Sequence, residues 1–232
     1  MADKQSNPVR TGQRGEKSLH AALKAWYAQP GDLLESRLDG YVIDIKRENL
    51  LIEIQTRNFG AFRHKISDLL KDNKVHIVYP IPQEKWIVRQ TAEGTTLARR
   101  KSPKRGTALD VFKELTHLAK LLTHPNLSLE IIFTREEEIW RDDGKGSWRR
   151  KHWSIHDRLL LDILGNIIFL SPPDYLRLLP VGLPHPFTNQ DLANACHQRI
   201  SLARRMTYTL RAIGCIEVNG KRGNKLLFGI IQ

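Results

Sequence analysis

The stretch Tyr41–Thr56, YVIDIKRENLLIEIQT, decides the fold class of this 232-residue chain. Two runs of alternating side chains flank a short polar connection, a pattern that predicts an antiparallel hairpin. Alternation places Asp44 on the opposite strand face from Ile43 and Ile45. Glu53 follows in the second run, so two carboxylates are expected close together on neighbouring strands. Like charges in such a position are destabilising unless a cation lies between them.

A hard divalent cation fits this pair of acids. Mg²⁺ takes oxygen ligands and is often held by one or two carboxylates, with water and phosphate oxygens completing its shell. Mn²⁺ is the alternative metal. A plainer interpretation stays open, in which Asp44, Glu53 and Gln55 form the solvated face of an ordinary hairpin.

Asp44 followed by Glu53-Ile54-Gln55 resembles the Asp…(Asp/Glu)-x-Lys signature of the PD-(D/E)xK nuclease superfamily. Gln55 stands where Lys is commonest. The resemblance implies an α/β, restriction-endonuclease-like fold with an αβββαβ core. It also implies metal-dependent hydrolysis of phosphodiester bonds, with Asp44 and Glu53 binding the metal.

The segment 15–26 matches the first helix of that core. An apolar face at helical spacing is formed by Leu19, Ala22, Leu23 and Trp26. Glu16 lies three residues before Leu19 on this face, and the resemblance makes it a third metal ligand. An acid in a first helical turn is also favoured by the helix dipole alone.

Gln55 carries no charge and can only form hydrogen bonds. The resemblance gives it the task of holding the attacking water. Two lysines could then supply the missing charge beside the phosphate. Lys46 shares its strand face with Asp44, and Lys65 lies in the next helical run, 64–70.

The charge balance indicates a polyanionic partner. The formal net charge is +12 and the sequence pI is about 9.9, and clustered cations gain affinity for phosphates by releasing counterions. DNA is the first candidate and RNA is possible. No apolar run is long enough to span a bilayer, so no membrane partner is expected. The two cysteines and the absence of an apolar leader favour a cytoplasmic protein.

The chain divides into three predicted parts. Residues 1–135 form the nuclease-like domain, with separate strands expected at 75–80 and 86–88. A basic run at 97–106 is expected to be an exposed loop that tracks phosphates, with these candidate residues: Arg99, Arg100, Lys101, Lys104 and Arg105. An amphipathic helix at 108–122 and a strand at 127–134 complete this part.

Residues 136–183 are predicted to form a basic hairpin and a connecting region. Trp148 and Trp153 alternate with cations there, as in grooves that bind nucleic acid. The candidate phosphate contacts are Arg149, Arg150 and Lys151. The tryptophans could equally pack inward.

Residues 184–232 resemble a winged helix-turn-helix domain, with helices at 188–196 and 202–213 and a hairpin whose turn begins at Asn219-Gly220. Such a domain would place its second helix in the major groove and its wing on phosphate. The candidate contacts are Arg204, Arg205, Tyr208, Lys221, Arg222 and Lys225. A role in dimerisation or packing is the alternative.

These patterns together predict a metal-dependent DNA endonuclease guided by a C-terminal winged helix. The competing hypothesis is a non-catalytic DNA-binding protein built on an inactive nuclease fold, which Gln55 motivates. A homodimer is possible, because two copies could cut both strands.

Overall fold

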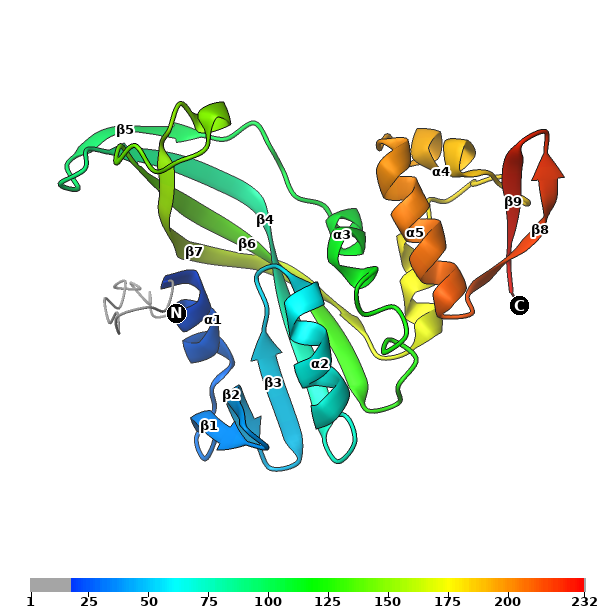
Figure 1. Ribbon diagram of the computed structural model, residues 1–232, viewed down its shortest axis with the longest axis horizontal. Helices are drawn as coiled ribbons and strands as arrows, with labels where there is room; N and C mark the ends of the chain where they lie inside the picture. Colours follow the sequence, from blue (N-terminus) through cyan, green and yellow to red (C-terminus); the bar gives the residue numbers. More distant parts are fainter. Residues whose placement is uncertain (1–17, 232) are drawn as a thin grey trace, which may run out of the picture.

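The computed structural model describes residues 18–231. They form an α/β protein with one large mixed sheet and one small two-stranded sheet (Figure 1). The large sheet is seven-stranded: β1 (Leu33–Leu38), β2 (Tyr41–Arg47), β3 (Leu50–Ile54), β4 (Lys74–Gln90), β5 (Thr96–Lys101), β6 (Leu127–Arg141) and β7 (Ser154–Phe169).

The strand order is β1-β2-β3-β4-β6-β7, with β5 paired to the second half of β4. β1, β2 and β3 form an antiparallel meander, whereas β4 lies parallel to both β3 and β6. Parallel neighbours need a crossover, and α2 (Phe59–Leu69) supplies it between β3 and β4. This helix begins five residues before the predicted run because Asn58 caps it, accepting a hydrogen bond from the Ala61 N–H.

Helices cover both faces of the sheet around β3 and the first half of β4. α1 (Ser18–Tyr27) buries Leu19 and Leu23 against one face, where Val78 of β4 also points. α2 packs against the opposite face, where the next cluster includes Ile77. Neighbouring residues of one strand thus serve two separate cores, as alternation along a strand requires.

β4 is a single strand of 17 residues through Pro80 and Pro82, where the sequence predicts two strands. The prolines are tolerated because β4 lacks a second partner at this point. Its pairing with β3 ends at Val78, and its pairing with β5 begins at Trp86. The missing N–H groups therefore break no ladder on that side.

The second halves of β4 and β6 and the first half of β7 extend beyond the helices as an arm, which β5 completes at its edge (Figure 1). The prediction of a loop throughout 97–106 is therefore wrong, because the first part of this run pairs with 86–90 as a strand. The predicted boundary at 135/136 falls inside β6, so its two flanking parts share one sheet. β5 pairs with β4, and β6 pairs with β4 and β7. This long-range pairing stabilises these charged strands although their local sequences only weakly indicate β-structure.

The predicted helix at 108–122 is also shorter than expected. The chain forms a 3₁₀ turn, η1 (Ala108–Val111), one helical turn, α3 (Phe112–Leu115), and then further turns. The apolar side chains of this segment are nevertheless buried, among them Phe112 and Leu118. Tertiary packing fills the core here without a continuous helix.

The C-terminal unit follows a 3₁₀ helix, η3 (Pro172–Leu178). It contains α4 (Asn189–Ala195), α5 (Ile200–Ala212) and a hairpin of β8 (Ile216–Arg222) and β9 (Lys225–Ile230). Thr188 caps α4, as its sequence predicts. The hairpin turn lies at 223–224 rather than at Asn219-Gly220, because Gly220 occupies a bulge inside β8.

Candidate functional site

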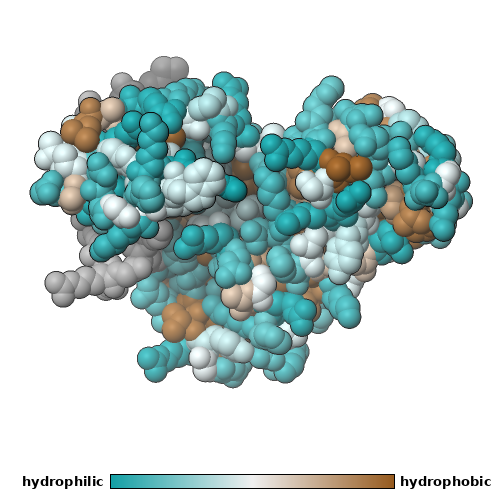
Figure 2. Space-filling view, turned by 45° about the horizontal axis from the view of Figure 1, so that its top comes forward, coloured by the Kyte–Doolittle hydropathy of each residue, from teal (hydrophilic) through white to brown (hydrophobic). Residues whose placement is uncertain are grey.

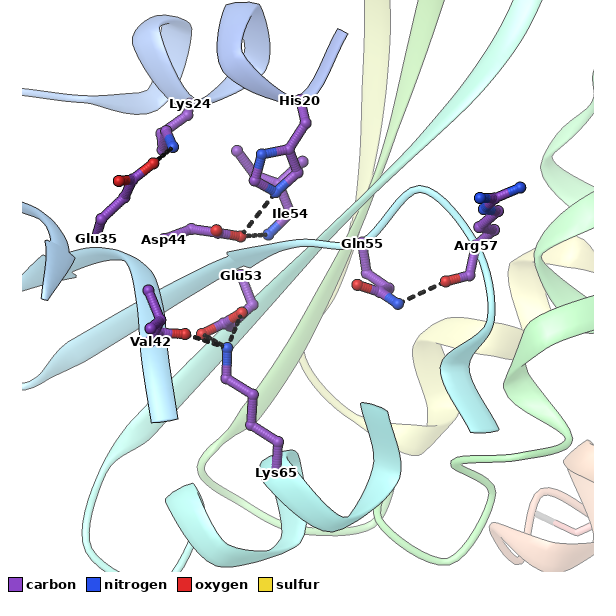
Figure 3. Close-up of polar contacts among 10 residues, drawn as sticks. All are labelled: His20, Lys24, Glu35, Val42, Asp44, Glu53, Ile54, Gln55, Arg57 and Lys65. Atoms are coloured by element: carbon purple, nitrogen blue, oxygen red, sulfur yellow. Dashed lines mark hydrogen bonds and ion pairs between the residues drawn. The ribbon is translucent and has the colours of Figure 1, made fainter. Parts of the chain in front are cut away.

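The site begins where β2 and β3 separate. Their ladder ends at the pair Ile45–Ile52, and Asp44 and Glu53 are the next residues along the two strands. Ile43 and Ile45 pack in the cores on opposite faces of the sheet, so the strict alternation predicted around Asp44 does not hold. The two carboxylates thus lie at an open strand end between α1 and α2 (Figure 3).

The Asp44 side chain links β2 to β3 at this point. Its Oδ2 accepts a hydrogen bond from the Ile54 N–H at 2.8 Å and lies 3.2 Å from His20 Nε2 on α1. Burial by itself raises the pKa of this carboxyl. The hydrogen bonds from His20 and Ile54 outweigh burial and hold the pKa of Asp44 below its usual value.

Glu53 is almost fully buried, with 3 % of its surface exposed. Burial raises its pKa to about 7, the Asp44 charge adds to the rise, and Lys65 offsets it only in part. The two acids therefore differ in pKa: Asp44 is ionised, whereas the pKa of Glu53 lies close to neutral pH. A second positive charge beside them would favour the ionised form of Glu53.

Lys65 reaches Glu53 from α2. Its Nζ lies 2.6 Å from each carboxylate oxygen and donates to the Val42 carbonyl at 2.6 Å (Figure 3). Glu53 Oε1 nevertheless accepts no hydrogen bond of good geometry. The crossover helix thus brings a cation to the acidic strand end, as the position of Lys65 in the sequence predicts.

The other predicted residues are less closely tied to this centre. Gln55 turns towards the following loop, where its Nε2 donates to the Arg57 carbonyl at 2.5 Å (Figure 3). Lys46, also within the described residues, forms no ion pair with Asp44 or Glu53. Glu16 lies outside the described residues.

Sequence reasoning missed His20, whose ring touches Asp44. The available signal was its position on the first helix, four residues after Glu16. α1 is held in place at its start, where the backbone N–H of Ser18 donates to Asp157 of β7 at 3.1 Å. The neighbouring arm therefore positions the helix that supplies His20.

His20 also lines a pocket beside the carboxylates, with a volume of about 640 Å³. Four cations converge on it: Arg57, Lys145, Arg150 and Arg158. We call it the cationic pocket. Of these four, only Arg150 is among the predicted phosphate contacts. Lys145 and Arg158 flank it in the sequence, whereas Arg57 comes from the distant loop after β3.

The remaining predicted contacts on the arm are exposed. Arg99 and Lys101 lie over the Trp86 ring, with the guanidinium carbon and the ammonium nitrogen 5.0 and 4.9 Å from its centroid. Arg100 on β5 and Lys104 and Arg105 in the loop after it are exposed, and Arg149 and Lys151 lie at the tip between β6 and β7.

One face of α5 is exposed and polar. Ser201, Arg204, Arg205, Tyr208 and Arg211 follow one another at helical spacing on it. Arg205 is partly engaged, because its Nη1 donates to the Lys113 carbonyl at 2.6 Å. On the hairpin, Lys221 and Lys225 are exposed, and the exposed Arg222 pairs with Asp191 at 3.2 Å.

Comparison with known proteins places the chain in a family. A family model described as "Domain of unknown function (DUF8091)" matches residues 17–170, from the start of α1 to the end of β7. The chain belongs to the DUF8091 family. An uncharacterized protein of Treponema pallidum (strain Nichols) is 32 % identical over 217 residues, covering 92 % of this chain and 84 % of that protein. No solved structure matches.

The DUF8091 match covers the whole large sheet and ends before the C-terminal unit. It includes Asp44, Glu53, Lys65 and every residue of the cationic pocket. Within residues 18–231, no group of three or more His, Cys, Asp or Glu side chains is arranged to hold a metal ion. No helix in that range combines the length and apolar character needed to cross a bilayer.

Proposed function

We propose that this protein is a metal-dependent nuclease that hydrolyses phosphodiester bonds in DNA. The observation behind the proposal is the convergence of Asp44, Glu53 and Lys65 where β2 and β3 separate. The element order α1-β1-β2-β3-α2-β4 also agrees with the αβββαβ core implied by the sequence resemblance. We therefore propose a restriction-endonuclease-like fold for this part of the chain.

The donor set fits Mg²⁺ or Mn²⁺. Asp44 Oδ1 accepts no hydrogen bond from a described residue, and Glu53 Oε1 is buried without a well-aligned donor. Asp44 Oδ1 is thus available to a hard cation, and Glu53 Oε1 becomes available if Lys65 Nζ, 2.6 Å away, shifts; water and phosphate would complete the shell. When bound, such an ion polarises the scissile phosphate and lowers the pKa of a bound water.

The chain's own groups would then divide the remaining work. Asp44 and Glu53 hold the cation, and His20 fixes the orientation of the Asp44 carboxylate through Oδ2. Lys65 lies close enough to neutralise charge on a phosphate bound beside Glu53. Gln55 would have to leave the Arg57 carbonyl before it could hold a water.

The C-terminal unit supports a targeting role. Two helices followed by a β-hairpin agree with the winged-helix resemblance, and the exposed face of α5 carries cations and Tyr208. We propose that α5 and the hairpin contact duplex DNA. Figure 2 shows a hydrophilic surface that is notched between the arm and this unit, which leaves room for a polar partner.

The experiment is cleavage of labelled single-stranded, duplex and branched DNA with Mg²⁺ or Mn²⁺, with EDTA as the blank. Asp44→Asn and Glu53→Gln should abolish cutting while binding persists. Asp72→Asn, in the exposed turn after α2, is the matched control and should cut normally. Normal cutting by either site variant would remove the proposed centre, and cleavage of RNA alone would change the substrate.

A non-catalytic DNA-binding protein is the second candidate. It is favoured by the orientation of Gln55 and by Lys65, which already neutralises Glu53 without a metal. In that case no nucleic acid is cut, and DNA affinity is the same with Mg²⁺, with EDTA and in Glu53→Gln.

A further inference from the structure

The cationic pocket lies directly beside the carboxylate pair. His20 belongs to both, since it lines the pocket and its Nε2 contacts Asp44 Oδ2 at 3.2 Å. Arg57 enters from the loop after β3, which places it four residues from Glu53 in the chain. A phosphate held in this pocket would therefore lie next to the two acids.

The pocket has an excess of positive charge. Among the described residues that line it, none is acidic. Arg57 and Lys145 form no ion pair with any described residue, whereas Arg158 shares Glu138 with Lys85. Unpaired cations in a recess raise the local concentration of anions. The chemistry therefore favours a ligand that carries phosphate.

The pocket also has apolar walls. Leu19 of α1 and Ile155 of β7 line it together with the cations. Cationic side chains suit phosphates, and apolar side chains suit the flat faces of sugars and bases. This combination occurs where proteins follow a single nucleic-acid strand.

The wall that carries Lys145 and Arg150 is a loop held by internal hydrogen bonds. The Gly146 N–H donates to the His152 carbonyl at 2.7 Å, and Ser154 Oγ donates to Asp143 at 2.8 Å. A Cβ at Gly146 would lie 1.8 Å from the Trp153 carbonyl oxygen, so no larger residue fits there. These contacts within the loop therefore fix this wall of the pocket.

The size of the pocket separates single strands from duplex. A volume of about 640 Å³ lies in the range of small-ligand sites, which is roughly 300–1,000 Å³. The major groove alone is about 12 Å wide, and a base-paired strand brings its partner with it. A single strand can turn both phosphates and bases into such a recess, whereas the bases of a continuous duplex stay paired and stacked inside the helix.

We propose that the cationic pocket binds a single-stranded segment of the substrate and holds its backbone phosphate beside Asp44 and Glu53. The proposal deepens the nuclease function, on which it rests. It assigns the protein to single strands, tails and flaps rather than to continuous duplex. Arg57 and Lys145 are the residues that discriminate, because neither forms an ion pair within residues 18–231.

The test measures binding in EDTA, so that nothing is cut. Fluorescence anisotropy compares a labelled single strand, its blunt duplex and the same duplex with a single-stranded tail. The double variant Arg57→Ala/Lys145→Ala is set against Lys74→Ala/Lys120→Ala, an equal change of charge at exposed positions. Lys74 pairs with Leu50, at the opposite end of β3 from the site.

We expect the pocket variant to lose at least tenfold in affinity for the single strand and the tailed duplex. Its affinity for blunt duplex and all affinities of the control should change less than threefold. The slope of log affinity against log salt for the single strand should fall by about 1.4, which is two phosphate contacts at about 0.7 each.

Equal losses on single strand and duplex, or a loss no larger than that of the control, would overturn the proposal. So would competition by inorganic pyrophosphate as strong as that by the single strand, which would indicate a small-molecule site. Failure of the nuclease function is seen separately. If the protein shows the expected binding pattern but cuts no substrate in Mg²⁺, the pocket proposal stands and the nuclease proposal is refuted.

Discussion

Lys65 and Glu53 form a buried ion pair, with the ammonium 2.6 Å from both carboxylate oxygens. The lysine comes from the crossover helix and the acid from the strand before it. The same ammonium donates to the Val42 carbonyl on β2. One side chain thus links three elements at the point where β2 and β3 separate.

Replacing Lys65 by Met should therefore reduce both stability and activity. Loss of one partner from a buried pair costs about 3–5 kcal/mol, and protonation of Glu53 limits this cost at low pH. We expect urea unfolding to show a larger loss at pH 8 than at pH 5. Cleavage should fall at least a hundredfold at both values. An equal loss of stability at the two pH values would contradict the coupling to Glu53.

Glu53 should make the metal-free protein less stable as the pH rises. Its pKa is raised from 4.5 to about 7, so folding opposes its ionisation. The penalty is absent below pH 4.5 and grows until the pH passes about 7. It reaches about 3 kcal/mol at most, at about 1.36 kcal/mol per pKa unit. Glu53→Gln should match the parent at pH 4.5 and exceed its melting temperature at pH 8.

Mg²⁺ provides a second readout of the same prediction. A cation that binds the folded protein raises its melting temperature, so the parent should gain stability with Mg²⁺ at pH 8. Glu53→Gln should gain little, and Asp72→Asn should gain as much as the parent. A gain by all three proteins alike would point to a metal site elsewhere.

His20 should act by positioning Asp44. Because its Nε2 contacts the Oδ2 atom, His20→Ala leaves that carboxylate less constrained and should lower kcat about tenfold, about 1.4 kcal/mol of barrier. KM should change less than twofold. His20→Gln can still donate a hydrogen bond and should recover part of kcat. A rise in KM with kcat unchanged would assign His20 to substrate binding instead.

Arg204 and Arg205 should behave differently although they are neighbours on α5. Arg204→Ala should weaken duplex binding and lower its salt slope by about 0.9, the value for one phosphate contact. Arg205 donates to the Lys113 carbonyl, so Arg205→Ala should mainly cost stability, about 1 kcal/mol. Titration of a labelled duplex at four salt concentrations, with a thermal melt of each variant, separates the two effects. Identical behaviour would contradict this assignment.

The local sequence identified most elements of the lower sheet and of the C-terminal unit. The strand–turn–strand pattern of 41–56, the apolar spacing around Leu19 and Leu23, and the Thr188 cap are local signals that the fold retains. The arm was misread, because charged strands such as β5 depend on pairing with residues far away in the chain. Pro80 and Pro82 likewise indicate a break between two strands when only the sequence is considered. Whether a strand can contain proline depends on which neighbouring strands it lacks, and that is a tertiary property.

The sequence by itself determined that this is a basic α/β protein with Asp44 and Glu53 on neighbouring strands. The resemblance to the nuclease signature also indicated Lys46 and Lys65 as sources of charge, of which Lys65 contacts Glu53. Only the tertiary structure decided that His20 contacts Asp44, that Gln55 turns away, and that Arg57 meets the cations of segment 145–158 in one pocket. Those contacts depend on how α1 and the arm pack against the sheet, and packing joins residues that no sequence window contains.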